Sequence, residues 1–169
     1  PAAQRPVLVR PILTPARDTT DKGEELPPNA LAPDLMRSIF RELFTGDGQN
    51  PPAAPSVVVV SLSVGDPAAP FDGIISSWAR TLDWLSATYG VIVIVSAGNH
   101  PVLPVPGGTN ALLSLTGADR AKVVNEGVAA TFPRRSLLAP ADSINGLSVG
   151  ALNDDGAGGV GISGYQFDP

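Results

Sequence analysis

The sequence predicts an α/β fold in which a mostly parallel sheet is flanked by helices. Residues 57–60 are four consecutive valines, and residues 91–95 contain only valine and isoleucine, so both segments are expected to be buried strands. Between them, apolar residues recur every three or four positions, which is typical of an amphipathic helix. A strand, a helix and a strand joined by short links form a right-handed crossover unit with parallel strands.

The other elements follow from the same periodicities and from proline and glycine positions. The expected strands cover residues 6–13, 56–64, 91–95 and 147–152. The expected helices cover residues 33–44, 72–89 and part of 110–130. Residues 14–28 are expected to form a surface loop, because this segment contains three prolines and mixed charges. The valine-rich strands lack apolar/polar alternation, which predicts that both faces of their sheet are covered.

The composition excludes several classes of protein and of site. The chain has 169 residues and a net charge of −5, which suits one domain and disfavours binding to nucleic acid. It has no cysteine, so disulfides, zinc–cysteine sites and thiol nucleophiles are excluded. No apolar run approaches the roughly 20 residues of a membrane-spanning helix, so no membrane partner is predicted. The localisation is not predicted from these residues.

Two patterns in the sequence are interpreted as turns and not as cofactor sites. Residues 156–161 fit the pattern G-x-G-x-x-G, but no helix follows and no acidic residue lies about twenty positions further on, so a nucleotide-binding domain is disfavoured. The paired carboxylates at residues 24–25 and 154–155 do not form a calcium loop. We therefore predict no metal and no cofactor, while a structural calcium ion stays open as an alternative that no motif supports.

The informative segments are the exits of the two valine-rich strands. In open α/β sheets, ligands gather beyond the carboxyl ends of the strands. Ser63 and Gly65 end the first strand, and Asn99 follows the small residues that end the second. Small residues allow a peptide backbone to approach closely, and an amide donor aimed at a developing oxyanion is a strong catalytic device. A strand followed by Gly-Asn also predicts a plain turn, and that reading stays open at this point.

The order of these segments resembles the central part of a subtilisin-like serine protease, or subtilase. The resemblance rests on residues 57–66, 91–100 and 147–156 and on the amphipathic helix between the first two. It implies a partial subtilisin-like fold and a peptide or protein substrate. The implied oxyanion donor is Asn99. The implied substrate-binding strand is Ser63, Val64 and Gly65, and the implied wall of the primary specificity pocket is Ser96, Ala97 and Gly98.

The sequence departs from the family at the catalytic triad. The D-[ST]-G, H-G-T and G-T-S-M-A motifs that carry the family's aspartate, histidine and serine do not occur in these residues. We therefore expect residues 1–169 to be a central fragment of a peptidase domain, inactive alone. His100 follows the oxyanion asparagine and is expected either to tune substrate charge at the pocket rim or to be a loop histidine.

Two further expectations remain. The competing class of function is a non-catalytic α/β binding or scaffold module with similar strand ends. An isolated part of a parallel sheet also exposes apolar faces and strand edges, which predicts self-association of the chain.

Overall fold

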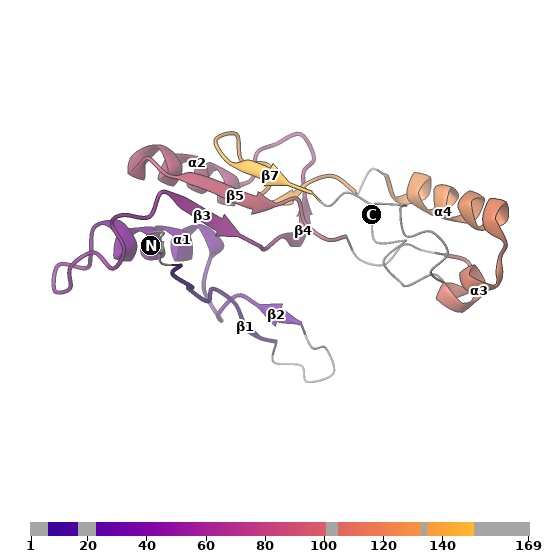
Figure 1. The fold of residues 1–169 in the computed structure, drawn as a ribbon, viewed down its shortest axis with the longest axis horizontal. Helices are drawn as coiled ribbons and strands as arrows, with labels where there is room; N and C mark the ends of the chain where they lie inside the picture. The colour runs from indigo at the N-terminus through magenta and orange to yellow at the C-terminus, as the bar shows by residue number, and fades with distance from the viewer. Residues whose placement is uncertain (1–6, 17–22, 101–104, 133–134, 151–169) are drawn as a thin grey trace, which may run out of the picture.

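The computed structural model describes residues 7–16, 23–100, 105–132 and 135–150. Its centre is a three-stranded parallel sheet in the order β3-β5-β7, formed by Val59–Leu62, Ile92–Ser96 and Leu147–Val149. The helices α1 and α2 pack against each other beside this sheet (Figure 1). The expected α/β class with a parallel sheet is confirmed.

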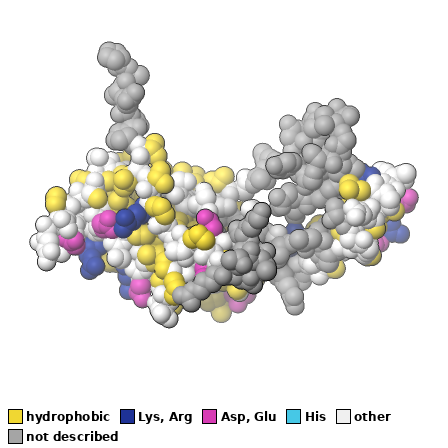
Figure 2. Space-filling model, turned by 90° about the horizontal axis from the view of Figure 1, so that it is seen from below, with side chains coloured by type: hydrophobic (Ala, Val, Ile, Leu, Met, Phe, Trp, Pro, Cys, Tyr) yellow, Lys and Arg dark blue, Asp and Glu magenta, His cyan; other side chains and the backbone are white. Residues whose placement is uncertain are grey.

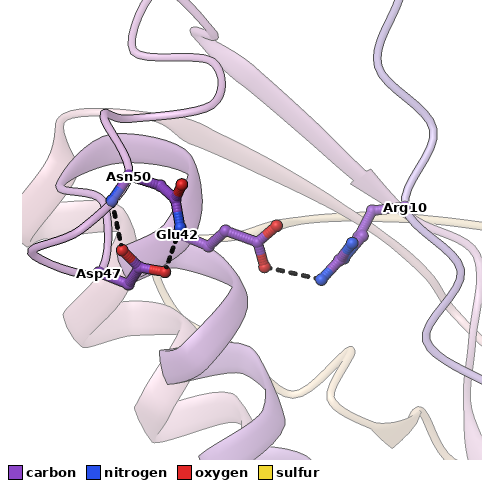
Figure 3. Close-up of polar contacts among 4 residues, drawn as sticks. All are labelled: Arg10, Glu42, Asp47 and Asn50. Atoms are coloured by element: carbon purple, nitrogen blue, oxygen red, sulfur yellow. Dashed lines mark hydrogen bonds and ion pairs between the residues drawn. The ribbon is translucent and has the colours of Figure 1, made fainter.

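Helix α1 spans Ala32–Phe44, which confirms the expected helix. It starts with Pro33 in its first turn, where a missing N–H costs no hydrogen bond. Its apolar stripe is buried in the core, and Arg10 from the preceding extended segment forms an ion pair with Glu42 on its polar side, 2.7 Å between Nη2 and Oε2 (Figure 3). The members of that stripe that are buried are Ala32, Met36, Ile39, Phe40 and Leu43.

Helix α2 spans Ser77–Tyr89 and has a hydrogen-bonded cap at each end. The Oγ of Ser76 accepts a hydrogen bond from the backbone N–H of Ala79 at 3.1 Å, which satisfies one of the free donors of the first turn. Gly90 ends the helix in the left-handed conformation, with φ +65°. The helix is shorter than expected, because residues 72–76 precede this cap.

A polar latch ties α2 to the segment that leads into β7. The backbone N–H and the Oγ of Ser76 both donate to the carboxylate of Asp142, at 2.5 and 3.0 Å. About two turns further along, the carboxylate of Asp83 accepts from Ser143 Oγ and from the backbone N–H of Asn145. These bonds join residues far apart in the sequence, so they fix where β7 enters the sheet.

Only one face of the parallel sheet is covered within the described residues, which corrects the expectation of two covered faces. Val93 and Val95 point into the core with α1 and α2 and are fully buried. On the opposite face, the side chains of four residues are about half exposed. They are Val59 at 46%, Ile92 at 57%, Leu147 at 56% and Val149 at 50%. Within the described residues, the run of valines is therefore not accompanied by a second layer that covers this face.

The expected strand at residues 6–13 is wrong over its described part, because residues 7–13 pair with no strand. Instead β1 (Thr14–Pro15) pairs antiparallel with β2 (Glu24–Glu25) in the expected surface loop. Pro11 lacks the N–H that a ladder needs, and Val7, Leu8 and Val9 remain exposed. Figure 2 shows exposed hydrophobic side chains interspersed with charged ones on the part of the molecule that contains the parallel sheet.

Further elements complete the described chain. The expected helix between residues 110 and 130 is two helices, α3 (Gly108–Ser114) and α4 (Gly117–Thr131), which lie at the far end of the molecule from α1 (Figure 1). Strands β4 (Asp66–Pro70) and β6 (Leu138–Ala139) pair antiparallel and were not expected. The expected last strand is confirmed for residues 147–149, while residues 151–152 and the glycines at 156–161 lie outside the described residues. No helix in the described ranges is long and apolar enough to cross a membrane.

The turn after α1 generates a prediction about pH. The side-chain amide of Asn50, and then the backbone N–H groups of Asn50 and Gln49, donate to Asp47 and lower the pKa of its carboxyl from 3.8 to about 2 (Figure 3). Since the folded pKa is depressed, this stabilisation is complete above pH 3.8 and is lost as the pH falls toward 2. An NMR titration is expected to show that Asn50→Ala raises the pKa of Asp47 toward 3.8.

Gln49→Ala is the matched control, because Gln49 donates through its backbone and not through its side chain. A pKa of Asp47 that is the same in the unmodified chain and in Asn50→Ala would contradict the assigned cause.

Candidate functional site

The parallel register of β3 and β5 brings the two strand exits side by side. Val59 pairs with Ile92 and Leu62 pairs with Val95, so residues 63–65 and 96–98 leave the same edge of the sheet next to each other. At their closest approach, a Cβ built on Gly65 would lie 3.2 Å from the Cα of Gly98. The structure therefore brings together the two segments in which the sequence placed its candidate residues.

The small residues at these exits have a partner within the chain. Leu138 from β6 packs over both glycines, and a Cβ on Gly98 would lie 2.6 Å from its side chain. Gly98 also has φ +97°, a conformation that L side chains rarely adopt. Leu138 therefore already occupies space beside these two glycines, where the sequence predicts the close approach of a peptide substrate.

The segment from Ser96 to Gly98 is held by backbone bonds on both sides. The N–H of Ala97 donates to the carbonyl oxygen of Val149 at 2.9 Å, and the carbonyl oxygen of Ala97 accepts from the N–H of Leu138 at 3.1 Å. The Oγ of Ser96 accepts from the N–H of Gly98 at 3.2 Å. These contacts fix the backbone that immediately precedes Asn99.

Asn99 and His100 differ in their surroundings. The side chain of Asn99 is exposed, and within the described part of the chain it has no hydrogen-bond partner. The ring of His100 is half-buried, and its Nε2 donates to the carbonyl oxygen of Ser136 at 2.8 Å. Of these two neighbours, Asn99 keeps its polar group free for a ligand, while His100 ties the strand exit to the segment before β6.

A groove lies on the outer side of the first strand exit. Ser63 and Val64 form one wall, residues 10–13 form the other, and the volume between them is about 250 Å³. Residues 63–65 are outside every strand ladder in the described sheets, so their backbone lies between the end of β3 and the start of β4. An extended segment has room to lie along this groove beside Ser63.

The sequence contains one further catalytic pattern, which the expectations above missed. Residues 146–150 read G-L-S-V-G and fit G-x-S-x-G, in which the serine is a nucleophile on a turn between a strand and a helix. Ser148 instead lies within β7, half-buried, and its Oγ donates to the carbonyl oxygen of Ala141. The pattern is therefore not a nucleophile elbow in this fold.

The described residues contain no group of three or more His, Asp or Glu side chains that could hold a metal ion. No protein-family model, no curated protein and no solved structure matches this chain. The geometry of the strand exits and the resemblance in the sequence are therefore the basis for a proposed function.

Gly98→Ala is expected to destabilise the chain more than Gly73→Ala. The two glycines have φ values of +97° and +102°, so both substitutions introduce similar backbone strain. Only at Gly98 would the added methyl group collide with Leu138, since nothing lies within 4 Å of the corresponding position at Gly73. Urea denaturation should show a free energy of unfolding about 1–3 kcal/mol lower for Gly98→Ala than for Gly73→Ala. Equal losses would contradict the packing described here.

Proposed function

We propose that this chain supplies the substrate-binding strand, the pocket wall and the oxyanion donor of a subtilisin-like serine endopeptidase. The observation that carries the proposal is the side chain of Asn99, which is exposed and unpartnered among the described residues at the end of β5. The adjacent exit of β3 supports it, because residues 63–65 lie beside the segment that precedes this asparagine.

In the proposed reaction, the hydroxyl of a serine attacks the carbonyl carbon of a peptide bond, and a histidine takes the hydroxyl proton. The carbonyl oxygen becomes negatively charged as the new C–O bond forms, and the amide N–H of Asn99 donates a hydrogen bond to it. The same histidine then gives the proton to the amine, which leaves as the C–N bond breaks, and water hydrolyses the remaining ester on the serine to release the acid. The serine, the histidine and its aspartate partner come from segments other than the 169 residues of this sequence.

The backbone around Asn99 suits this role. An oxyanion donor must be in place before the charge develops, because reorganising it during the reaction would raise the barrier. The bonds of Ala97 to Val149 and Leu138 hold the preceding backbone in the way such a donor requires. A peptide substrate would lie extended along Ser63, Val64 and Gly65, where main-chain pairing places its carbonyl near residue 99.

A second candidate is a non-catalytic α/β binding or scaffold module. The contact of Leu138 with Gly65 and Gly98 favours it, since that contact accounts for both glycines without any substrate. On this reading Asn99 is a residue of an exposed turn. The two candidates differ in what the amide of Asn99 does, which an experiment distinguishes directly.

Asn99→Ala is expected to lower kcat on a generic peptide substrate about 10²–10³-fold with little change in KM, in the polypeptide that carries the complete triad. Removal of the oxyanion asparagine of subtilisin has an effect of this magnitude. Asn110→Ala is the matched control, because Asn110 is an exposed asparagine of α3. Turnover that is unchanged by Asn99→Ala would contradict the role assigned to Asn99, whereas no turnover in the unmodified polypeptide would favour the non-catalytic module.

The face of the parallel sheet that no described residue covers supports self-association of the chain. The exposed side chains of this face are uncharged: Val59, Ile92, Leu147 and Val149. Two copies of the chain can therefore meet at this face without repulsion between like charges, although the net charge of each is −5. Sedimentation at micromolar concentration is expected to show species larger than the monomer. Ile92→Lys should restore the monomer, because it places a charge within this face.

Ile144→Lys is the control for that change, since Ile144 is an exposed isoleucine outside the strands. A strictly monomeric unmodified chain would contradict self-association and would leave the role of Asn99 unaffected.

A further inference from the structure

A groove between the exposed sides of α1 and α2 forms a second concave surface, separate from the strand exits. Its volume is about 320 Å³, at the lower end of the range for ligand sites. Since Gly90 and Val91 link α2 directly to the start of β5, the end of α2 lies at the opposite edge of the sheet from Asn99. The groove is lined by Asp34, Arg37, Ser38, Arg41, Trp84 and Tyr89.

The two arginines of this groove are the feature that needs explaining. Neither Arg37 nor Arg41 has an ion pair or a side-chain hydrogen bond within the described residues, although the chain is acidic overall. The guanidinium carbon of Arg37 lies 5.8 Å from the centre of the Trp84 ring. A guanidinium over an aromatic ring keeps its N–H edge free, and that edge matches the two oxygens of a carboxylate.

The aromatic wall of the groove is partly fixed and partly open. Tyr89 is half-buried and stacks on Phe44 with ring centres 4.9 Å apart, so its position is set by the core. Trp84 is 54% exposed, although it is the larger of the two side chains. Tryptophan and arginine are among the side chains that contribute most to binding at protein interfaces, and here they are exposed next to each other.

We propose that this groove binds an extended peptide segment with carboxylate side chains at alternate positions. Arg37 and Arg41 are four residues apart on one helix, which separates them by about 6 Å along the axis. Side chains at alternate positions of an extended chain lie on the same side and about 6.6 Å apart. Two carboxylates with that spacing reach both guanidiniums at once, while the peptide backbone lies along Trp84.

The charge of the groove limits the partner to a short acidic segment. Asp34 lies one turn before Arg37 and reduces the positive potential of the groove. A long polyanion such as nucleic acid needs many cationic contacts, and the net charge of −5 repels it. A peptide that places only two carboxylates against the arginines avoids both problems.

The test is a calorimetric titration of the unmodified chain with blocked pentapeptides. The sequence Ala-Glu-Ala-Glu-Ala is expected to bind with a dissociation constant of ~1 mM or below at low ionic strength. Ala-Gln-Ala-Gln-Ala should give no saturable signal. Ala-Glu-Glu-Ala-Ala has the same charge but adjacent carboxylates, and it should bind several-fold more weakly. Inorganic phosphate should not compete at equal concentration.

Variants at exposed positions separate the groove from general charge effects. Arg37→Gln combined with Arg41→Gln should weaken binding by about tenfold or more, and Asp34→Asn should strengthen it. Lys122→Gln removes one exposed positive charge from α4 and should leave binding unchanged. Equal binding of the glutamate and glutamine peptides, equal binding of the two glutamate spacings, or wild-type affinity in the double variant would each overturn the proposal. None of these results bears on the proposed peptidase role, because the groove and Asn99 share no residue.

Discussion

The parallel pairing of β3 with β5 is the constraint on which the remainder of the structure depends. Leu62, Val93 and Val95 are buried against α1 and α2, and burial of branched side chains on that face fixes the register of both strands. A slip of one residue would move these side chains to the opposite face. The same register determines that residues 63–65 and 96–98 leave the sheet as neighbours, so core packing and the geometry of the candidate site have one cause.

The polar latch between α2 and residues 142–145 extends that constraint to β7. Asp142 and Asp83 accept hydrogen bonds that span more than sixty residues of sequence, and removal of one partner would leave a half-buried carboxylate or hydroxyl unsatisfied. With β7 held in place, the carbonyl of Val149 accepts from Ala97. The backbone beside Asn99 is thus supported by bonds that begin on α2.

Local periodicity explains which parts of this fold were predictable. The stripe of α1 and the cap at Gly90 depend on neighbours within a few residues, and the structure confirms both. The valine-rich strands depend on the same local pattern and are confirmed at Val59–Leu62 and Ile92–Ser96, so the first is shorter than the expected 56–64. The covering of the second sheet face, the pairing of β4 with β6 and the contact of Leu138 with Gly98 depend on residues distant in sequence. The sequence pattern of an apolar run such as residues 7–13 is the same whether or not another strand pairs with it. The pattern therefore predicts a strand that the structure does not have.

Because of the contact that Leu138 makes with Gly65 and Gly98, the proposed function depends mainly on Asn99. Glycines at two strand exits favour a close ligand only while nothing in the chain occupies the space, and here Leu138 occupies it. A packing role accounts for Gly65 and Gly98, and a hydrogen bond to Ser136 accounts for the half-buried ring of His100. The exposed side chain of Asn99 has no such account among the described residues, although the backbone before it is held by bonds to Val149 and Leu138. A free amide on a fixed backbone is the arrangement that stabilisation of an oxyanion needs, so the proposed chemistry depends on this one side chain.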